Sequence, residues 1–240
     1  RHPCQIARGK GFRVGDSQHA RILNDEAADI NRCRQPAEIL GLEKVDLYGH
    51  SWGTILAVEY YRTHPEHVNA ILLASPALDI PAWEANAREL VKTLPDSLQR
   101  AIAVREASGE YDAPDYQAAI MAFYGQYVWR HRVEADLDST LATVNEGIYN
   151  YMQGPSEFTI TGTLKTYDAT PYLSEIRVPV LYTVGEFDEA NPELVRRFAD
   201  ATPGARMTVI PGAAHITTWD NPEANLDAVW TFLRDADARR

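Results

Sequence analysis

The chain has 240 residues, 45% of them hydrophobic, and a formal net charge of −11, so it can bury the core of one globular domain, with or without an inserted subdomain. The acidic balance argues against nucleic acid and membranes as partners, because nucleic acid and anionic lipid both repel an acidic surface. No stretch approaches the run of about eighteen apolar residues that a membrane-spanning helix needs.

Only two cysteines are present, Cys4 and Cys33, which does not suggest a disulfide-stapled scaffold in a chain of this length. No cluster of His, Cys or carboxylate residues has the spacing of metal ligands, so we expect no metal and no cofactor. The chain starts with basic residues but has no apolar run behind them, which is not the pattern of a secretory signal. We therefore expect a cytoplasmic protein.

The first forty residues give little structural signal. Residues 25–42 have some helical spacing, but Pro36 interrupts the pattern and Gly41 is suited to end a helix. From residue 44 the pattern is clearer. A short strand (44–49) leads to Ser51, and an amphipathic helix follows that ends at Pro65.

A nearly continuous apolar run at 68–77 then predicts a strand buried on both faces, as in a parallel sheet. With the strand and helix before it, this run makes a strand-helix-strand unit. From about residue 78 to 167, helical patterns dominate and strands are scarce. The predicted helices are 82–94, 96–107, 114–132 and 134–152, and a loop (153–171) follows them.

The alternation of strands and helices resumes after this stretch. Two further strands are predicted at 178–188 and 205–215, with a helix between them and another at the end of the chain. Both helices begin with Asn-Pro-Glu, where the asparagine can cap the helix and proline suits its first position. The sequence therefore predicts the α/β class, with a mostly parallel sheet and an inserted helical subdomain.

The segment "GHSWG" (49–53) places Ser51 between two glycines where the first strand meets a helix. This G-x-S-x-G pattern is typical of a nucleophile elbow, a sharp turn that lifts the serine hydroxyl above the sheet. We expect the two glycines to prevent side-chain collisions in the turn. The N-terminus of the following helix favours negative charge developing nearby.

Asp188 and His215 each follow a later predicted strand. The order Ser, Asp, His, each at the carboxyl end of a strand, predicts the catalytic triad of an α/β-hydrolase. His215 would take the proton of Ser51, and Asp188 would orient the imidazole and stabilise its charged form. The backbone N–H of Trp52 would be one donor of the oxyanion hole.

Other chemically capable residues are more simply explained by structure. His50 lies beside the serine, but we expect a structural or pocket-lining role for its side chain. Asp220 precedes the last helix and is expected in a turn. The aromatic residues of the helical stretch, such as Trp129 and Tyr149, are expected mainly in the core, with one or two lining a pocket.

Residues from about 40 onward resemble α/β-hydrolases of the proline iminopeptidase (prolyl aminopeptidase) type. The similarity covers "VDLYGHSWGTILAVEYYRTHPEHVNAILLASP", the segments around Asp188 and His215, and "GPSEF" (154–158) with its following "GTL". The GPSEF segment is more specific than GHSWG, because most α/β-hydrolases lack it. The resemblance implies an α/β-hydrolase core formed by 1–79 and 168–240, with a helical cap at 80–167.

The resemblance also implies how a substrate is held. In that family, carboxylates bind the free α-amino group of the substrate, and their positions match Glu157 and Glu189 here. A cationic ammonium in a partly desolvated pocket does need anionic partners. The implied activity is hydrolysis, through an acyl-enzyme, of small substrates with a free α-amino group. Candidates are N-terminal aminoacyl peptides and amino acid amides or esters.

One family feature has no counterpart in the sequence. Family members carry an "HGGPG"-like loop before the nucleophile, which supplies a second oxyanion N–H, and no such stretch occurs here. We expect the N-terminal part of the core to be either divergent or truncated, and the chain then to associate or to need a further N-terminal piece. Two alternatives remain open: an esterase, amidase or lactonase of the same fold, or a catalytically impaired binding protein.

Overall fold

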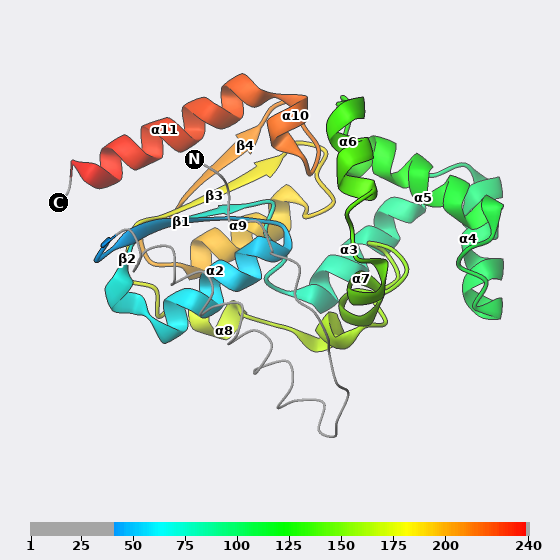
Figure 1. The fold of residues 1–240 in the computed structure, drawn as a ribbon, viewed down its shortest axis with the longest axis horizontal. Helices are drawn as coiled ribbons and strands as arrows, with labels where there is room; N and C mark the ends of the chain where they lie inside the picture. The colour runs from blue at the N-terminus through cyan, green and yellow to red at the C-terminus, as the bar shows by residue number, and fades with distance from the viewer. Residues whose placement is uncertain (1–40, 239–240) are drawn as a thin grey trace.

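The computed structural model describes residues 41–238. In this part of the chain, four parallel strands form one sheet in the order β1-β2-β3-β4 (Figure 1). The strands are β1 (Val45–His50), β2 (Val68–Ala74), β3 (Val180–Gly185) and β4 (Arg206–Ile210). The predicted α/β class with a parallel sheet is confirmed. The part of the predicted helix at 25–42 that precedes residue 41 lies outside the described residues.

Helices cover both faces of the sheet. On one face lie α2 (Trp52–Thr63) and α9 (Pro192–Ala201), and on the other lies α11 (Pro222–Asp237) (Figure 1). Ile71 and Leu73 of β2 belong to the core on the α2 and α9 side, whereas Leu72 between them packs toward α11. This alternation explains why β2 needs a continuous apolar sequence.

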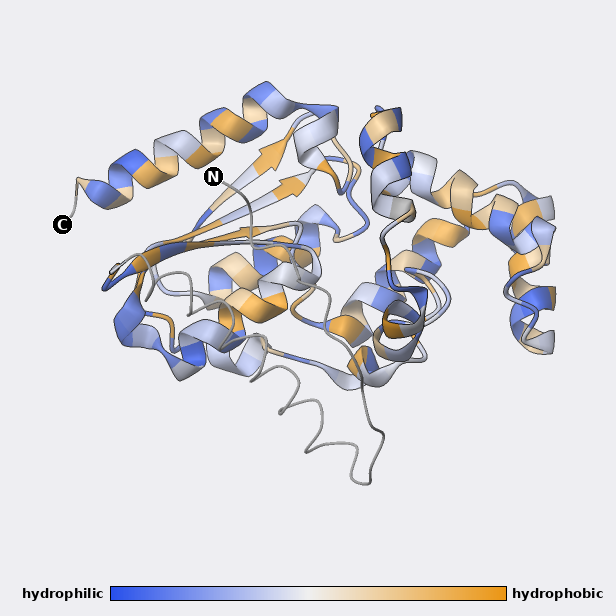
Figure 2. Cartoon of the chain, in the orientation of Figure 1, coloured by the Kyte–Doolittle hydropathy of each residue, from blue (hydrophilic) through white to orange (hydrophobic). Residues whose placement is uncertain are grey.

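Hydropathy follows the same layering. The strands are largely hydrophobic, whereas α11 alternates between hydrophobic and hydrophilic residues, as expected of a helix with one face against the sheet (Figure 2). The predicted asparagine caps are confirmed. The Asn191 side chain accepts a hydrogen bond from the Glu193 N–H at 2.8 Å, and Asn221 accepts one from the Ala224 N–H at 3.1 Å.

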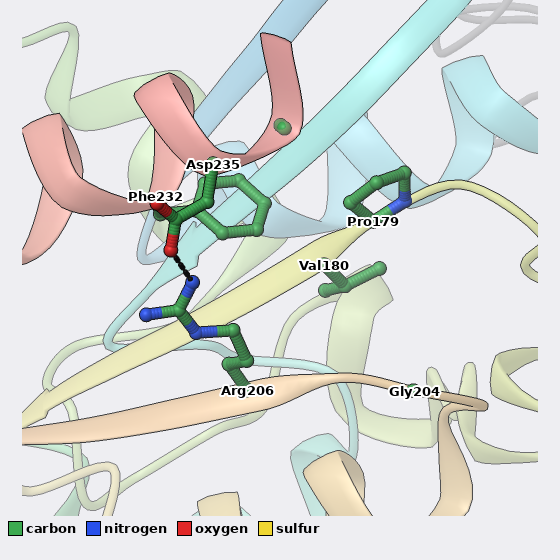
Figure 3. A pocket seen from close by; sticks show the side chains of 7 residues that line it. Pro179, Val180, Gly204, Arg206, Phe232 and Asp235 are labelled. Atoms are coloured by element: carbon green, nitrogen blue, oxygen red, sulfur yellow. Dashed lines mark hydrogen bonds and ion pairs between the residues drawn. The ribbon is translucent and has the colours of Figure 1, made fainter. Parts of the chain in front are cut away.

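At the amino ends of β3 and β4, an ion pair ties the sheet to α11. Arg206 Nη1 lies 2.7 Å from Asp235 Oδ2, beside Pro179 and Phe232 (Figure 3). The cavity that these residues line has a volume of only about 10 Å³. It is too small for a substrate, and it lies at the end of the sheet opposite to the strand ends that precede Ser51, Asp188 and His215.

Between β2 and β3 the chain forms mainly helices, and those from α3 to α7 lie beyond the carboxyl ends of the strands (Figure 1). We call residues 80–167 the helical insertion; these bounds stay a prediction. It has a hydrophobic cluster of its own, which includes Tyr116, Phe123 and Phe158. Its elements, with the short helix that follows it, are α3 (Ile80–Val91), α4 (Asp96–Ser108), α5 (Pro114–Tyr127), α6 (Glu134–Leu141), α7 (Glu146–Met152), η2 (Thr163–Thr166) and α8 (Thr170–Leu173).

Several predicted elements are shorter in the structure than in the sequence pattern; β3, for example, spans Val180–Gly185 where 178–188 was predicted. The predicted helix 134–152 is two helices, because Asn145 caps a new one by accepting a hydrogen bond from the Ile148 N–H at 3.1 Å. The predicted helix 114–132 ends at Tyr127, and the predicted strand 205–215 ends at Ile210. Pro211 follows that strand and cannot donate to a sheet ladder.

Two more short helices complete the described chain, η1 (Pro65–His67) before β2 and α10 (Thr217–Asp220) before α11. Over residues 41–238, no helix combines the length and the apolar character needed to cross a membrane.

Candidate active site

Ser51 stands at a strained turn between β1 and α2. Its backbone angles are φ 54° and ψ −123°, a conformation that residues with side chains rarely adopt. A Cβ on Gly49 would lie 2.3 Å from the carbonyl oxygen of Gly53, so the turn closes this tightly only with glycine at 49. A Cβ on Gly53 would meet nothing within 4 Å. The expectation that both glycines prevent collisions is therefore wrong for Gly53.

The turn is held by bonds at both ends. The Ser51 N–H donates to the Ala74 carbonyl at the end of β2 (3.0 Å), and the Thr54 hydroxyl donates to the Ser51 carbonyl (2.6 Å). Trp52 is the first residue of α2, so its N–H has no acceptor within the helix and is available to another group. These contacts fix the backbone around the serine while its side chain stays partly exposed.

The side chains of Asp188 and His215 are hydrogen-bonded to each other. His215 Nδ1 lies 2.9 Å from Asp188 Oδ1, and both residues are buried. Asp188 also accepts hydrogen bonds from the backbone N–H groups of Ala190 (2.8 Å) and Gly185 (3.2 Å). Burial alone would raise the pKa of Asp188. The charge and hydrogen bond of His215, with further donors, outweigh this and hold the pKa below its usual value.

The backbone of His215 is held on both sides. Its N–H donates to the Tyr127 carbonyl at the end of α5 (3.1 Å). Its carbonyl accepts from Ser75 Oγ (3.0 Å) and from His50 Nε2 (2.9 Å). The ring of Trp83 meets the imidazole edge-on, with centroids 5.4 Å apart. Among the described residues, no hydrogen bond joins Ser51 Oγ to His215; the two loops meet through His50.

Asp220 is not an ordinary turn residue. Its side chain is fully buried and accepts three backbone hydrogen bonds. They come from Arg130 (2.8 Å) and His131 (2.6 Å) of the helical insertion and from Ala214 (2.8 Å). Since Ala214 directly precedes His215, Asp220 connects the insertion to the histidine loop.

Glu157 is held by two donors within the insertion. The Tyr149 hydroxyl lies 2.7 Å from Glu157 Oε1, and Gln153 Nε2 lies 2.9 Å from Oε2. Burial raises the pKa of Glu157, although Tyr149, the charge of His215 and Gln153 each lower it. Trp83 joins the two centres, because its ring contacts His215 and its Nε1 donates to the Glu157 carbonyl at 3.3 Å.

Glu189 is a buried carboxyl that lacks a full set of partners. Its side chain is 1% exposed, Oε1 lies 4.0 Å from His215 Nδ1, and Oε2 has no hydrogen-bond partner among the described residues. Burial, and then the negative charges of Glu157 and Asp188, raise its pKa well above the usual value. A cation placed between Glu157 and Glu189 would relieve this burial cost.

The structure therefore brings all six predicted residues into one region. Asp188 and His215 are bonded, Glu189 directly follows Asp188, Glu157 connects to His215 through Trp83, and Ser51 connects through His50. Trp52 begins the helix behind the serine. Tyr149 and Gln153 were not predicted as partners of Glu157, and Asp220 was predicted only in a turn.

Sequence patterns carry little signal for these partners. Tyr149 lies in an aromatic-rich helical stretch that suggests core packing, and the residues that Asp220 contacts in the insertion lie about 90 positions away.

Within residues 41–238, no group of three or more His, Cys, Asp or Glu side chains could hold a metal ion.

Comparison with known proteins places these features in a family. A family model described as "alpha/beta hydrolase fold" matches residues 23–222. A proline iminopeptidase from Heyndrickxia coagulans is 37% identical over 233 residues, which are 95% of this chain and 79% of the relative. One from Saccharolobus solfataricus is 29% identical, over 82% of this chain and 64% of the relative.

A solved structure agrees with the sequence relatives. The crystal structure of a proline iminopeptidase from Mycobacterium smegmatis superimposes with a TM-score of 0.80 and 30% identity, covering 88% of this chain and 71% of that chain. The chain thus spans about two thirds to four fifths of the length of these relatives.

Proposed function

The chain belongs to the proline iminopeptidases of the alpha/beta hydrolase family, and we propose that it is a serine hydrolase for small substrates with a free α-amino group. That it is a hydrolase follows from the family. The serine mechanism and the substrate class are proposed from the site. Candidate substrates are N-terminal aminoacyl peptides and amino acid amides or esters.

In the proposed mechanism, Ser51 Oγ attacks the scissile carbonyl carbon while His215 takes the hydroxyl proton. The carbonyl oxygen becomes an oxyanion, to which the free N–H of Trp52 can donate. His215 then gives the proton to the leaving amine or alcohol, and an ester of Ser51 remains. A water molecule, deprotonated by His215, attacks this ester and releases the acid and Ser51. The 2.9 Å bond from His215 to Asp188 supports this assignment, because it orients the imidazole.

The observation that carries the substrate class is the unpartnered oxygen of Glu189. A fully buried carboxyl with an empty hydrogen-bonding position, beside a second carboxylate at Glu157, is costly unless a cation completes it. The α-ammonium group of a substrate has that charge and three donors. Bound there, it would hold the scissile carbonyl near Ser51.

We propose that the helical insertion acts as the cap of this site. It supplies Glu157, its donors Tyr149 and Gln153, and the carbonyl of Tyr127 that binds the Glu189 and His215 N–H groups. Glu189 comes from the loop after β3. The ammonium would then lie between core and insertion, which makes the insertion part of substrate recognition.

A pair of matched esters tests the proposal. We expect an aminoacyl ester with a free amine to be hydrolysed with a kcat/KM at least tenfold above that of its N-acetylated twin. Ser51→Ala should abolish turnover of both, because the hydroxyl is the nucleophile. Equal rates on the two esters would argue for a generic esterase. Full activity of Ser51→Ala would exclude the mechanism.

A further inference from the structure

We infer that His50 is a positioning residue, whose ring N–H holds the backbone carbonyl of His215 and so aims the imidazole at Ser51. The inference deepens the serine mechanism proposed above and rests on it. It concerns a side chain directly beside the nucleophile in the sequence, for which a structural or pocket-lining role was expected.

The contact has a defined direction. His50 Nε2 lies 2.9 Å from the His215 carbonyl oxygen, and a carbonyl can only accept, so Nε2 must carry the hydrogen. The two rings lie against each other with centroids 4.8 Å apart and planes tilted by 52°. Burial and the neighbouring charge of His215 lower the pKa of His50 to about 4, so the ring is a neutral, single donor near neutral pH.

A second donor reaches the same oxygen. Ser75 Oγ lies 3.0 Å from the His215 carbonyl, and the residue is held at φ 48° at the end of β2, with its N–H bonded to the Thr183 carbonyl at 2.7 Å. The two lone pairs of one carbonyl are thus used by donors from two neighbouring strand ends. Strained backbone that is held in this way is characteristic of functional sites.

These contacts matter because the histidine loop has left the sheet. β4 ends at Ile210, so no strand ladder fixes residue 215. The Tyr127 carbonyl holds the His215 N–H, and Asp188 holds one ring nitrogen. His50 and Ser75 hold the carbonyl side of the peptide plane that follows His215, and the Val128 carbonyl holds its Ile216 N–H. Since His50 directly precedes Ser51, its bond also ties the position of the base to that of the nucleophile.

Two substitutions separate the hydrogen bond from ring packing. His50→Phe keeps a ring against His215 but removes the donor, and His50→Gln keeps an N–H donor at a similar reach but removes the ring. We expect His50→Phe to lower kcat roughly tenfold on both the free and the N-acetylated ester, with little change in KM. His50→Gln should recover most of that loss. The same order is expected for the rate at which a fluorophosphonate labels Ser51, counted per folded molecule.

His67→Phe is the matched control. His67 Nδ1 also bonds a backbone carbonyl, that of Glu43, at 2.9 Å, but it precedes β2 at the other end of the sheet. The His67→Phe variant should react with the fluorophosphonate and hydrolyse both esters at wild-type rates. Should His50→Phe fail to fold, Ser75→Ala removes the second donor to the same carbonyl, together with a hydrogen bond to Asp188, and should slow labelling as well.

Three results would overturn the inference: a wild-type labelling rate in His50→Phe, no recovery in His50→Gln, or losses confined to the free-amine ester. If the wild type itself is not labelled at Ser51, both the serine mechanism and the inference are contradicted. A wild type that is labelled, with a His50→Phe variant equally fast, overturns the inference alone.

Discussion

At the scale of single residues, strained backbone conformations are concentrated at the candidate site. In the described chain, three residues other than glycine have a positive φ: Ser51 (54°), Ser75 (48°) and Asn191 (58°). Ser51 and Ser75 directly follow β1 and β2, and Asn191 lies in the loop that carries Asp188 and Glu189. Each such conformation costs of order 1–3 kcal/mol and persists only where the surroundings enforce it.

Gly49→Ala tests how far the elbow depends on its tight turn. The new Cβ would lie 2.3 Å from the Gly53 carbonyl oxygen and 2.6 Å from its carbon, so β1 and α2 must move apart. We expect a loss of about 1–3 kcal/mol in the free energy of unfolding, measured with urea, and a large loss of turnover. A variant as stable as the wild type would contradict this geometry.

Gly53→Ala is the matched control for that experiment. Its Cβ would enter open space, and the position lies in the first turn of α2, where alanine is at least as favourable as glycine. We expect its free energy of unfolding to equal or slightly exceed that of the wild type. Destabilisation as large as that of Gly49→Ala would mean that the two glycines play the same part.

Glu189→Gln tests the buried carboxyl by its effect on stability. The pKa of Glu189 is raised in the folded state, so above its unfolded value of 4.5 the folded protein binds the proton more tightly than the unfolded chain. Stability from this group is therefore lost as pH rises, by up to about 1.4 kcal/mol per pH unit until the folded pKa is passed. A glutamine at position 189 has no proton to lose, so the variant lacks this fall in stability with pH.

We accordingly expect urea unfolding to show Glu189→Gln gaining stability relative to the wild type between pH 5 and pH 8. The comparison between variant and wild type removes the contributions of titrating groups that lie far from Glu189. A stability difference that does not change with pH would show that Glu189 has the same proton affinity in both states.

At the scale of elements, the segment after α5 links the insertion to both loops of the site. The Tyr127 carbonyl binds the N–H groups of Glu189 and His215, and the Val128 carbonyl binds that of Ile216 at 2.8 Å. The buried Asp220 side chain adds three backbone hydrogen bonds from the other side. The predicted helix 114–132 stops at Tyr127 because these backbone groups bond outside the helix, which no helical pattern can reveal.

Asp220→Ala measures this link. It leaves three backbone N–H groups without an acceptor. Water can replace Asp220 at the exposed Arg130 and His131, whereas the N–H of the buried Ala214 costs about 1–3 kcal/mol when it is left unpaired. We expect a loss of about 1–3 kcal/mol in the free energy of unfolding and a fall in kcat on both esters, because the His215 loop is released. Asp220→Asn should be milder, since its oxygen can still accept.

Asp227→Ala, on the exposed face of α11, is the control for Asp220→Ala and should change stability by less than about 0.5 kcal/mol. Equal effects at positions 220 and 227 would show that the hydrogen bonds of Asp220 do not support the histidine loop.

At the scale of the whole molecule, local patterns predicted much of the architecture. The continuous apolar run of β2, the Asn-Pro-Glu helix starts and the G-x-S-x-G turn each depend on residues close in sequence. The contacts that join these elements to one another do not depend on residues close in sequence. The sequence could not show that α11 packs on the face opposite to α2 and α9, because that contact is made between distant segments. Tyr149 and Glu157 are close in sequence, but the direction in which Tyr149 points depends on how α7 and the following loop pack.

The insertion has one hydrophobic cluster of its own, but its residues Ile80, Trp83 and Leu164 belong to the main core, so both apolar packing and polar contacts join the insertion to the sheet. Glu157 belongs to the insertion and Glu189 to the core, so a bound ammonium would contact both. Recognition of the amine is therefore the property that requires the whole described chain to be assembled correctly.

The most direct test is the ratio of kcat/KM on the free-amine ester to that on its N-acetylated twin, in Glu157→Gln, Glu189→Gln and the wild type. Loss of one charge-assisted bond is worth about 1.5–3 kcal/mol, so each variant should lower the ratio roughly ten- to a hundredfold. Glu193→Gln, on the exposed first turn of α9, should leave the ratio unchanged. Equal losses on both esters, with the ratio preserved, would contradict the account, because the two glutamates would then serve structure alone.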